Sequence, residues 1–284
     1  MGVAARGVCS SSSVMEQAGH DAAGSTHDIS DEILRKLAAQ PHPKYNVPVD
    51  VAAKVGRNLH KQAGHPLNII KSTVEGFFDT VPGPKWKSLD DYHPVVTTEA
   101  NFDQLLIPAD HVSRSPSDTF YVNDKELLRC HTSAHQTETM RRGERAFLVS
   151  GDVYRRDAVD SSHYPVFHQM EGVRIYSDDE VLPSQHCSRL PRSWQRSANH
   201  RCPWPPQIPP DMPRNEVVEI VSKDLQGTLD AMVKTVFGDV EVRWIDEYFP
   251  FTEPSFEMEI FFQDEWLEVG ACWYRAPAPC MATH

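Results

Sequence analysis

The stretch GDVYRRDAVDSSHYPVFHQMEGVRIY, from Gly151 to Tyr176, decides the fold of this chain. Apolar and polar residues alternate on both sides of a polar loop, which predicts two strands joined by that loop. Arg155 shares a face with the apolar residues of the first strand, and Gln169 and Glu171 share a face with those of the second. If the two faces meet, the sheet carries a guanidinium that binds anions beside an acid that binds an ammonium group. The residues alone also allow an exposed sheet face with an Arg–Glu cross-strand pair.

Regular patterns continue on both sides of this hairpin. Further strands are predicted by β-branched and aromatic runs at Val95–Thr98, Val240–Ile245, Phe256–Phe262 and Trp266–Val269. Helical spacing predicts two helices between Val51 and Phe78, one at Ser133–Arg142 and a long one at Glu216–Phe237. The order of these elements predicts an α+β fold with a mostly antiparallel sheet.

Two segments lack such patterns. Residues 1–29 are rich in Gly, Ser and Ala, and we expect a disordered tail or a weak transit peptide there. Residues 183–214 contain many of the chain's 22 prolines without an apolar period, which indicates an irregular insertion. We therefore expect one domain over residues 30–284 that includes this insertion.

The composition excludes several classes of function. Lys and Arg number 28 against 40 Asp and Glu, so the net charge of −12 argues against a general basic surface for nucleic acid. No segment approaches the ~20 apolar residues of a membrane span, and we expect none. The six cysteines show no CxxC spacing, which argues against a zinc knuckle or a disulfide framework.

Four segments together resemble the class II aminoacyl-tRNA synthetases, in the form of phenylalanyl-tRNA synthetase. The Gly151–Tyr176 hairpin is similar to motif 2 of that family. PVVTTEANFDQLLIPADHVSR (94–114) is similar to motif 1 of the family, and LLRCHTSAHQ (127–136) is similar to its HTSxxQ segment. RWIDEYFPFTEPSFEMEI (243–260) is similar to its FPFTEPS segment. The spacing and the residues of these segments resemble most those of the single-chain enzymes of mitochondria and plastids. The resemblance implies the class II catalytic fold, an antiparallel sheet flanked by helices.

This resemblance also implies roles for individual residues. Arg155 is the implied catalytic residue, which would hold the α-phosphate of ATP and the substrate carboxylate. The implied substrate-binding residues are His131, Ser133, His135, Gln136, Gln169, Glu171, Phe249 and Phe251, the last two as an aromatic slot for a phenyl group. The implied ATP-binding residues are Arg155, His163, Phe167, His168 and Glu268, with Glu268 supporting ATP together with Mg²⁺.

The implied activity is that of a phenylalanine–tRNA ligase that uses ATP and Mg²⁺. Its partners would be phenylalanine and tRNA(Phe), and we expect a monomer in the mitochondrion or plastid without membrane association. Residues 270–284 do not match the family's GxGxER-type motif 3, so the catalytic fold is expected to be incomplete at the C-terminus, without the anticodon-binding domain. A second interpretation is therefore a catalytically impaired synthetase that acts as a phenylalanine-binding or interaction module.

Simpler interpretations exist for some of these residues. His131 and His135 have the i, i+4 spacing of a metal pair, but no third ligand recurs nearby and we predict no metal site. Cys130 is interpreted as a buried thiol rather than a nucleophile. Without the resemblance, core packing would be the better interpretation of Phe249 and Phe251.

Overall fold

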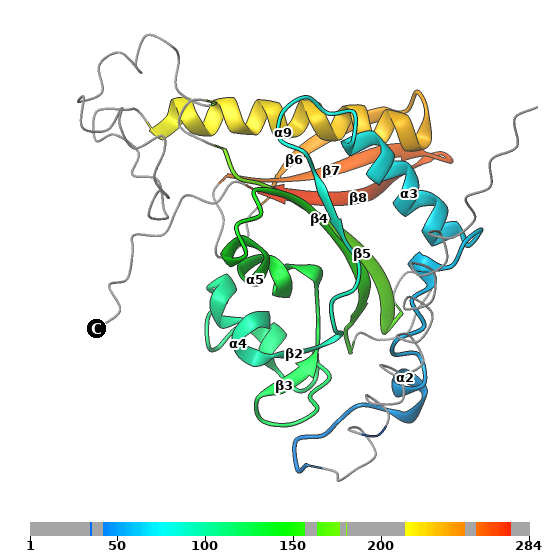
Figure 1. Ribbon diagram of the computed structural model, residues 1–284, viewed down its shortest axis with the longest axis vertical. Helices are drawn as coiled ribbons and strands as arrows, with labels where there is room; N and C mark the ends of the chain where they lie inside the picture. The colour runs from blue at the N-terminus through cyan, green and yellow to red at the C-terminus, as the bar shows by residue number, and fades with distance from the viewer. Residues whose placement is uncertain are drawn as a thin grey trace, which may run out of the picture.

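Helix α9 (Arg214–Phe237) lies across two sheets and connects them (Figure 1). The structure is a computed structural model that describes residues 35, 42–156, 164–176, 180, 214–247 and 254–273. The other helices named among the described residues are α2 (Val49–Ala52), α3 (Pro66–Phe78), α4 (Thr98–Asn101), α5 (Gln136–Arg141) and the short 3₁₀ helices η1 (Leu59–Lys61), η2 (Asp103–Leu105), η3 (Val112–Arg114) and η4 (Thr132–His135). The strands are β1 (Lys87–Leu89), β2 (Val95–Thr97), β3 (Glu126–Leu128), β4 (Ala146–Tyr154), β5 (Val166–Arg174), β6 (Glu241–Glu247), β7 (Ser255–Phe262) and β8 (Glu265–Trp273).

The described strands form three sheets, in the orders β1-β4-β5, β2-β3 and β6-β7-β8. β1 runs parallel to β4, and the other neighbouring strands are antiparallel. In the β4–β5 hairpin, Val149 lies opposite Glu171 and Gly151 lies opposite Gln169. The predicted α+β fold with mostly antiparallel pairing is thus confirmed, and the polar residues of β5 share a face with the apolar residues of β4.

The core surrounds β4, which is buried along its whole length. Near its start, Leu148 packs with Val74 and Phe78 of α3, and Met232 of α9 closes this cluster. Helix α9 also covers the other sheet, where Val233 is 0% exposed and packs against the β7 side chains. Because α9 contributes to both clusters, it fixes the two sheets relative to each other.

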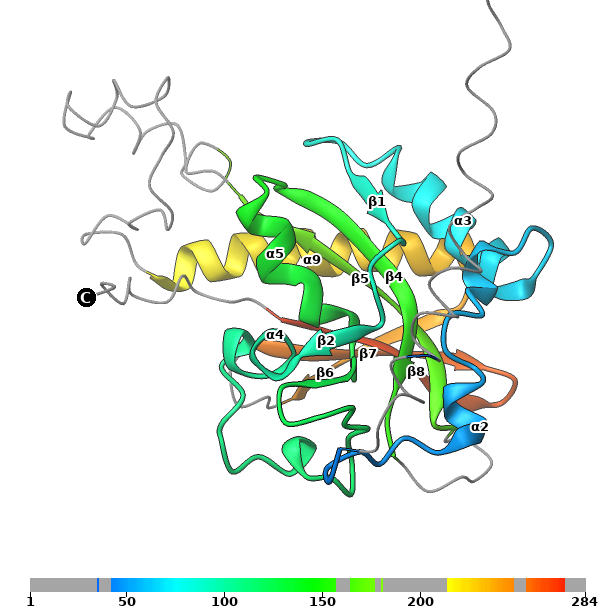
Figure 2. The ribbon, with the colours of Figure 1, turned by 60° about the horizontal axis from the view of Figure 1, so that its bottom comes forward.

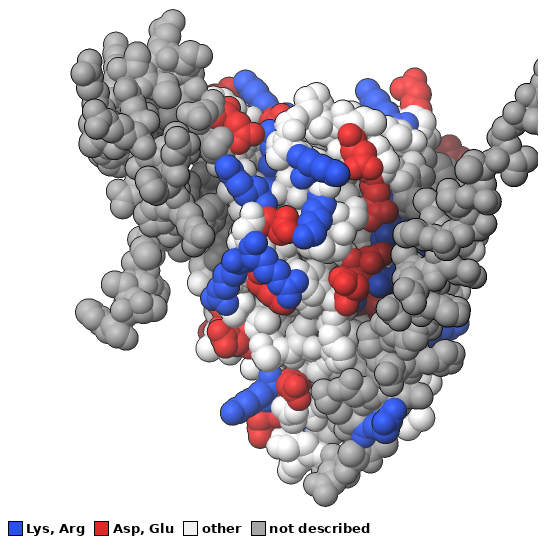
Figure 3. Space-filling view, viewed as in Figure 1, with Lys and Arg blue, Asp and Glu red and all other residues white. Residues whose placement is uncertain are grey.

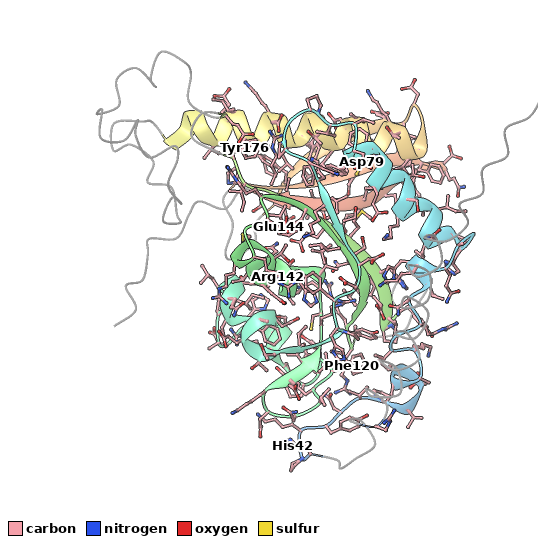
Figure 4. All side chains as sticks on the ribbon, viewed as in Figure 1. His42, Asp79, Phe120, Arg142, Glu144 and Tyr176 are labelled. Carbon is pink, nitrogen blue, oxygen red and sulfur yellow. The ribbon has the colours of Figure 1, made fainter. Side chains whose placement is uncertain are left out.

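At the other end of β4, Tyr154 packs with Val51, Phe120 and Leu128 in a second cluster. Figure 4 shows Phe120 at this end of the hairpin and Tyr176 at the opposite end, beside α9. The Tyr176 hydroxyl donates a hydrogen bond to Asp224 of α9 at 2.5 Å. Both ends of the hairpin are therefore anchored.

The prediction of a first continuous helix between Val51 and Phe78 is wrong. The chain forms the single turn α2 and the short 3₁₀ helix η1 there, separated by Gly56 with a φ of 76° and Asn58 with a φ of 49°, which a right-handed helix does not admit. The second helix is confirmed as α3. The expected tail at 1–29 and nearly all of the insertion at 183–214 lie outside the described residues.

Figures 1 and 2 both place α5 beside β4, whereas α3 lies on the other side of the hairpin. This arrangement sets the HTSAHQ segment, which forms η4 and starts α5, against one face of β4 and β5. On the face seen in Figure 3, basic and acidic side chains are intermixed over the described residues. None of the described helices has both the length and the apolar character that crossing a membrane requires.

Candidate functional site

Glu171 is the centre of a polar cluster on the face of the β4–β5 hairpin that α5 covers. The Gln136 side-chain amide donates to its Oε1, and the Thr132 hydroxyl donates to its Oε2 at 3.2 Å. Burial raises the pKa of Glu171, and hydrogen bonds from Ser133, Gln136 and Thr132 oppose that rise. A carboxylate surrounded by neutral donors keeps acceptor sites for a cation.

Gln169 extends this cluster along β5. Its Oε1 accepts a hydrogen bond from the backbone N–H of Thr132 at 3.3 Å. Gln169 and Glu171 lie two positions apart on one strand, so both side chains face η4. The predicted substrate-binding residues Ser133, Gln136, Gln169 and Glu171 are therefore brought together.

Arg155 follows the last residue of β4 and lies along the same face. Its Nε donates to the carbonyl oxygen of Cys130 at 3.0 Å, and its guanidinium lies over the Phe167 ring, 5.2 Å from the centroid. The backbone N–H of Arg155 bonds to Pro165, whereas Glu171 lies opposite Val149. The two charges are therefore too far apart along the hairpin to form a cross-strand pair.

The two histidines of the HTSAHQ segment remain neutral. Burial and the positive charge of Arg155 lower the pKa of His131 to about 4. Burial and the charge of Arg129 lower the pKa of His135 to about 3. The His135 ring stacks on Tyr92 at a centroid distance of 4.3 Å, and its Nε2 lies 3.1 Å from Arg129 Nη1. Since arginine only donates, this nitrogen of His135 is the acceptor.

His135 is thus buried behind the cluster and contacts an arginine that the sequence analysis missed. Arg129 pairs with Asp152 at 3.2 Å, and their side chains are only 2% and 4% exposed. The available signal was a charged residue within each of two apolar strand segments, LLRC and GDVY. Among the described residues, no group of three or more His, Cys, Asp or Glu is arranged to hold a metal ion. Cys130 is buried, with its Sγ 3.2 Å from the Thr119 hydroxyl.

His168 lies on the opposite face of β5 from Phe167 and Gln169. It is paired with Asp152 in the strand register, and its ring lies 5.6 Å from that of His60. Burial lowers the pKa of His168, and the negative charge of Asp152 partly offsets that lowering. With Lys54 and other residues it lines a pocket of about 100 Å³ on this opposite face. The structure does not bring His168 together with Arg155 and Phe167.

Glu268 lies on β8, in a different sheet from the cluster around Glu171, and its side chain is exposed. It is close to Glu257, whose pKa is raised by burial and by the charge of Glu268. The remaining predicted residues, His163, Phe249 and Phe251, lie outside the described residues. Their roles remain predictions.

Residues 48–183 and 217–277 match the family model of the tRNA synthetases class II core domain (F). The chain is 44% identical over 236 residues to the chloroplastic/mitochondrial phenylalanine–tRNA ligase of Arabidopsis thaliana, covering 83% of this chain and 48% of that protein. It is 46% identical over 248 residues to the mitochondrial phenylalanine–tRNA ligase of Dictyostelium discoideum, covering 82% of this chain and 50% of that protein. It is 48% identical over 236 residues to the mitochondrial phenylalanine–tRNA ligase of Rattus norvegicus, covering 80% of this chain and 48% of that protein.

The chain spans about half the length of these curated relatives. The family model covers the hairpin, the HTSAHQ segment and the sheet β6-β7-β8, which together contain the site described above. By this match, the chain belongs to the family of class II tRNA synthetase core domains.

Proposed function

We propose that this chain is the amino-acid-activating part of an organellar phenylalanine–tRNA ligase. The observation that carries the proposal is the cluster in which Thr132 and Gln136 donate to Glu171, on the same face as Arg155 and Phe167. The names of the relatives support phenylalanine and tRNA(Phe) as substrates and the mitochondrion or plastid as the location. ATP is the third substrate.

In this proposal, Glu171 binds the ammonium group of phenylalanine. Its two oxygens offer about four acceptor positions, and the donors from η4 and α5 leave room for a cation. The Gln169 amide and the Ser133 hydroxyl orient the amino acid beside it. Because this carboxylate is enclosed, its attraction for a charged amine is stronger than it would be in water.

Arg155 acts on the other end of the amino acid. One carboxylate oxygen of phenylalanine attacks the α-phosphorus of ATP, a new P–O bond forms, and the bond to pyrophosphate breaks. The Arg155 guanidinium stabilises the negative charge that develops on the phosphoryl oxygens. Its Nε is held by the Cys130 carbonyl, so the group is oriented before the substrates bind. Phe167 presents an aromatic face on which adenine stacks.

The second step returns the adenylate group as AMP. A hydroxyl of the terminal ribose of tRNA(Phe) attacks the aminoacyl carbonyl carbon, and the bond to the phosphate breaks. Positioning and charge neutralisation are sufficient for both steps, so no covalent bond to the enzyme is required. We further propose that the protein acts as a monomer.

Mg²⁺ fits the carboxylates on the β6-β7-β8 sheet. This ion commonly uses one or two carboxylates together with substrate phosphates, so a three-residue cage is not required. Glu257 and Glu268 supply such a pair: burial raises the pKa of Glu257, and so does the neighbouring charge of Glu268, which a divalent cation would neutralise. When bound, the ion supplies charge neutralisation of the phosphates.

The test is phenylalanine-dependent exchange of pyrophosphate into ATP by the full chain. Arg155→Ala should lower the rate by about 10²–10³-fold, because it removes a charged donor from the transition state. Arg156→Ala is the matched control, since the neighbouring Arg156 is exposed and bonds to Pro116 instead of facing the cluster. Its exchange rate should stay within about twofold of wild type.

The two interpretations of the chain give different results. Absence of exchange, with calorimetric binding of phenylalanine that Glu171→Gln abolishes, would support the impaired phenylalanine-binding module instead. Absence of both exchange and binding would refute the proposed function. Equal exchange in the two arginine variants would remove Arg155 from its catalytic role.

A further inference from the structure

Arg129 is a buried arginine, 2% exposed, that connects three separate segments of the chain. Its Nε donates to the backbone oxygen of Asp152 at 2.7 Å, and its Nη2 donates to the Asp152 carboxylate at 3.2 Å. Its Nη1 donates to the Tyr92 carbonyl at 3.2 Å and to His135 Nε2 at 3.1 Å. A guanidinium has five N–H groups, so these contacts satisfy most of its donors.

The charge of Arg129 is balanced inside the protein. Burial raises the pKa of Asp152, but the Arg129 charge and the Tyr154 hydroxyl outweigh this and lower it. Tyr154 donates its hydroxyl to Asp152 Oδ2, so both carboxylate oxygens are used. Removing one partner of such a buried pair is strongly destabilising, because it leaves the other charge without compensation.

The guanidinium also occupies a place on β4 that only glycine allows. A Cβ on Gly151 would lie 2.1 Å from Arg129 Nη2 and 2.8 Å from Cζ. Gly151 lies opposite Gln169 in the hairpin, so Arg129 sits directly beside the polar cluster. Its position is determined by space as well as by hydrogen bonds.

The backbone next to Arg129 holds the functional side chains. The carbonyl of Cys130 accepts the hydrogen bond from Arg155 Nε at 3.0 Å. The backbone N–H of Thr132 donates to Gln169 Oε1 at 3.3 Å. The backbone carbonyl of Arg129 itself accepts a hydrogen bond from the backbone N–H of Tyr154 at 2.9 Å. A shift of this segment would therefore move Arg155 and the donors around Glu171 together.

We propose that Arg129 is a positioning residue that locks the segment 130–136 against β4 and thereby orients Arg155 and the cluster around Glu171. Arg129 does not itself touch the substrate. The kinetic consequence of this role rests on the proposed function, whereas the ordering of the segment does not.

The test compares Arg129→Lys with Arg114→Lys. Lysine keeps the charge but loses the planar fork that serves several acceptors at once. Arg114 is the control, because it also pairs with an aspartate, Asp103, at 2.7 Å, although these two side chains are 20% and 55% exposed. Arg114 has no contact with the segment 130–136 among its described hydrogen bonds.

Two readouts are measured on the full chain. Hydrogen exchange of the backbone amides in residues 130–136 should accelerate at least about tenfold in Arg129→Lys and stay unchanged in Arg114→Lys. In pyrophosphate exchange, Arg129→Lys should lower kcat by about tenfold to a hundredfold, because misplacement of a reacting group by about 1 Å has that effect. Arg114→Lys should keep the wild-type kcat, even where its thermal midpoint falls equally.

Asp152→Asn provides a second variant if Arg129→Lys does not fold. It keeps the size of the side chain and removes the negative charge, and it should accelerate amide exchange in the same residues. Equal protection of residues 130–136 in the control and in the folded variants would overturn the proposal. If the wild-type chain shows no pyrophosphate exchange, the proposed function fails while the amide measurement still decides the role of Arg129.

Discussion

Acid should destabilise this protein because two buried histidines must stay neutral in the folded state. The pKa of His131 is lowered to about 4 and that of His135 to about 3, against an ordinary value of 6.5. At pH values between the lowered pKa of each histidine and its ordinary value of 6.5, the unfolded chain therefore binds more protons than the folded protein. The contribution of these histidines to the free energy of unfolding is fully present above about pH 6.5 and is lost as the pH falls toward about 4.

The size of the effect follows from the shifts. Each pH unit below the ordinary value costs about 1.4 kcal/mol per histidine, so lowering the pH from about 7.5 to about 5 removes about 2 kcal/mol for each. Burial also lowers the pKa values of His60 and His168, which act in the same direction. Glu171 acts in the opposite direction, because its raised pKa favours protonation in the folded state as the pH falls.

His135→Gln isolates one part of this effect. The glutamine Oε1 stands near the position of the histidine Nε2 and still accepts from Arg129, but it does not titrate. Urea unfolding followed by tryptophan fluorescence gives the free energy of unfolding at each pH. Between about pH 7.5 and about pH 5, the variant should lose about 2 kcal/mol less than wild type, and above about pH 7.5 the two curves should run parallel. The same pH dependence in both proteins would refute the burial of a neutral His135.

Three further changes test the packing, each followed by urea unfolding. Gly76→Ala should raise the free energy of unfolding by about 1 kcal/mol, because Gly76 lies inside α3 with nothing within 4 Å of an added Cβ. Gly151→Ala should lower it by about 1–3 kcal/mol, because the methyl group would overlap the Arg129 guanidinium; an unchanged value would show that the guanidinium does not lie against β4. Val233→Ala should cost about 2–3 kcal/mol at a fully buried position, whereas Val112→Ala, at a side chain 71% exposed, should stay within about 0.5 kcal/mol.

The elements that the sequence predicted well are those with a long and regular pattern. β4, β5, β7 and α9 each repeat an apolar period over at least eight residues, so their positions follow from residue type alone. β1 and β3 have only three residues each and provide no period. The expected helix after Val51 is not continuous, because α2 ends at Ala52 and the left-handed backbone conformations of Gly56 and Asn58 interrupt the helical apolar spacing.

The same alternation explains how far the site was predictable. It places Gln169 and Glu171 on one face of β5, where the structure has both of them facing η4. By the same period, Phe167 and His168 must point to opposite faces, so a shared ATP site for the two conflicts with the strand pattern. The family resemblance suggested both residues, and the period of the strand separates them.

Arg129 and Asp152 show why the support of the site was harder to predict than the site itself. They are 23 residues apart, and neither lies in a local pattern that identifies its partner. Arg129 directly follows the apolar end of β3 and Asp152 interrupts β4, and a buried charge requires a partner of opposite sign. Two such interruptions, one beside the HTSAHQ segment and one within the motif 2 strand, together indicate a buried ion pair. Because a polar cluster such as that around Glu171 gains its specificity only when every member is held in place, the ion pair beneath it is part of how the sequence encodes the site.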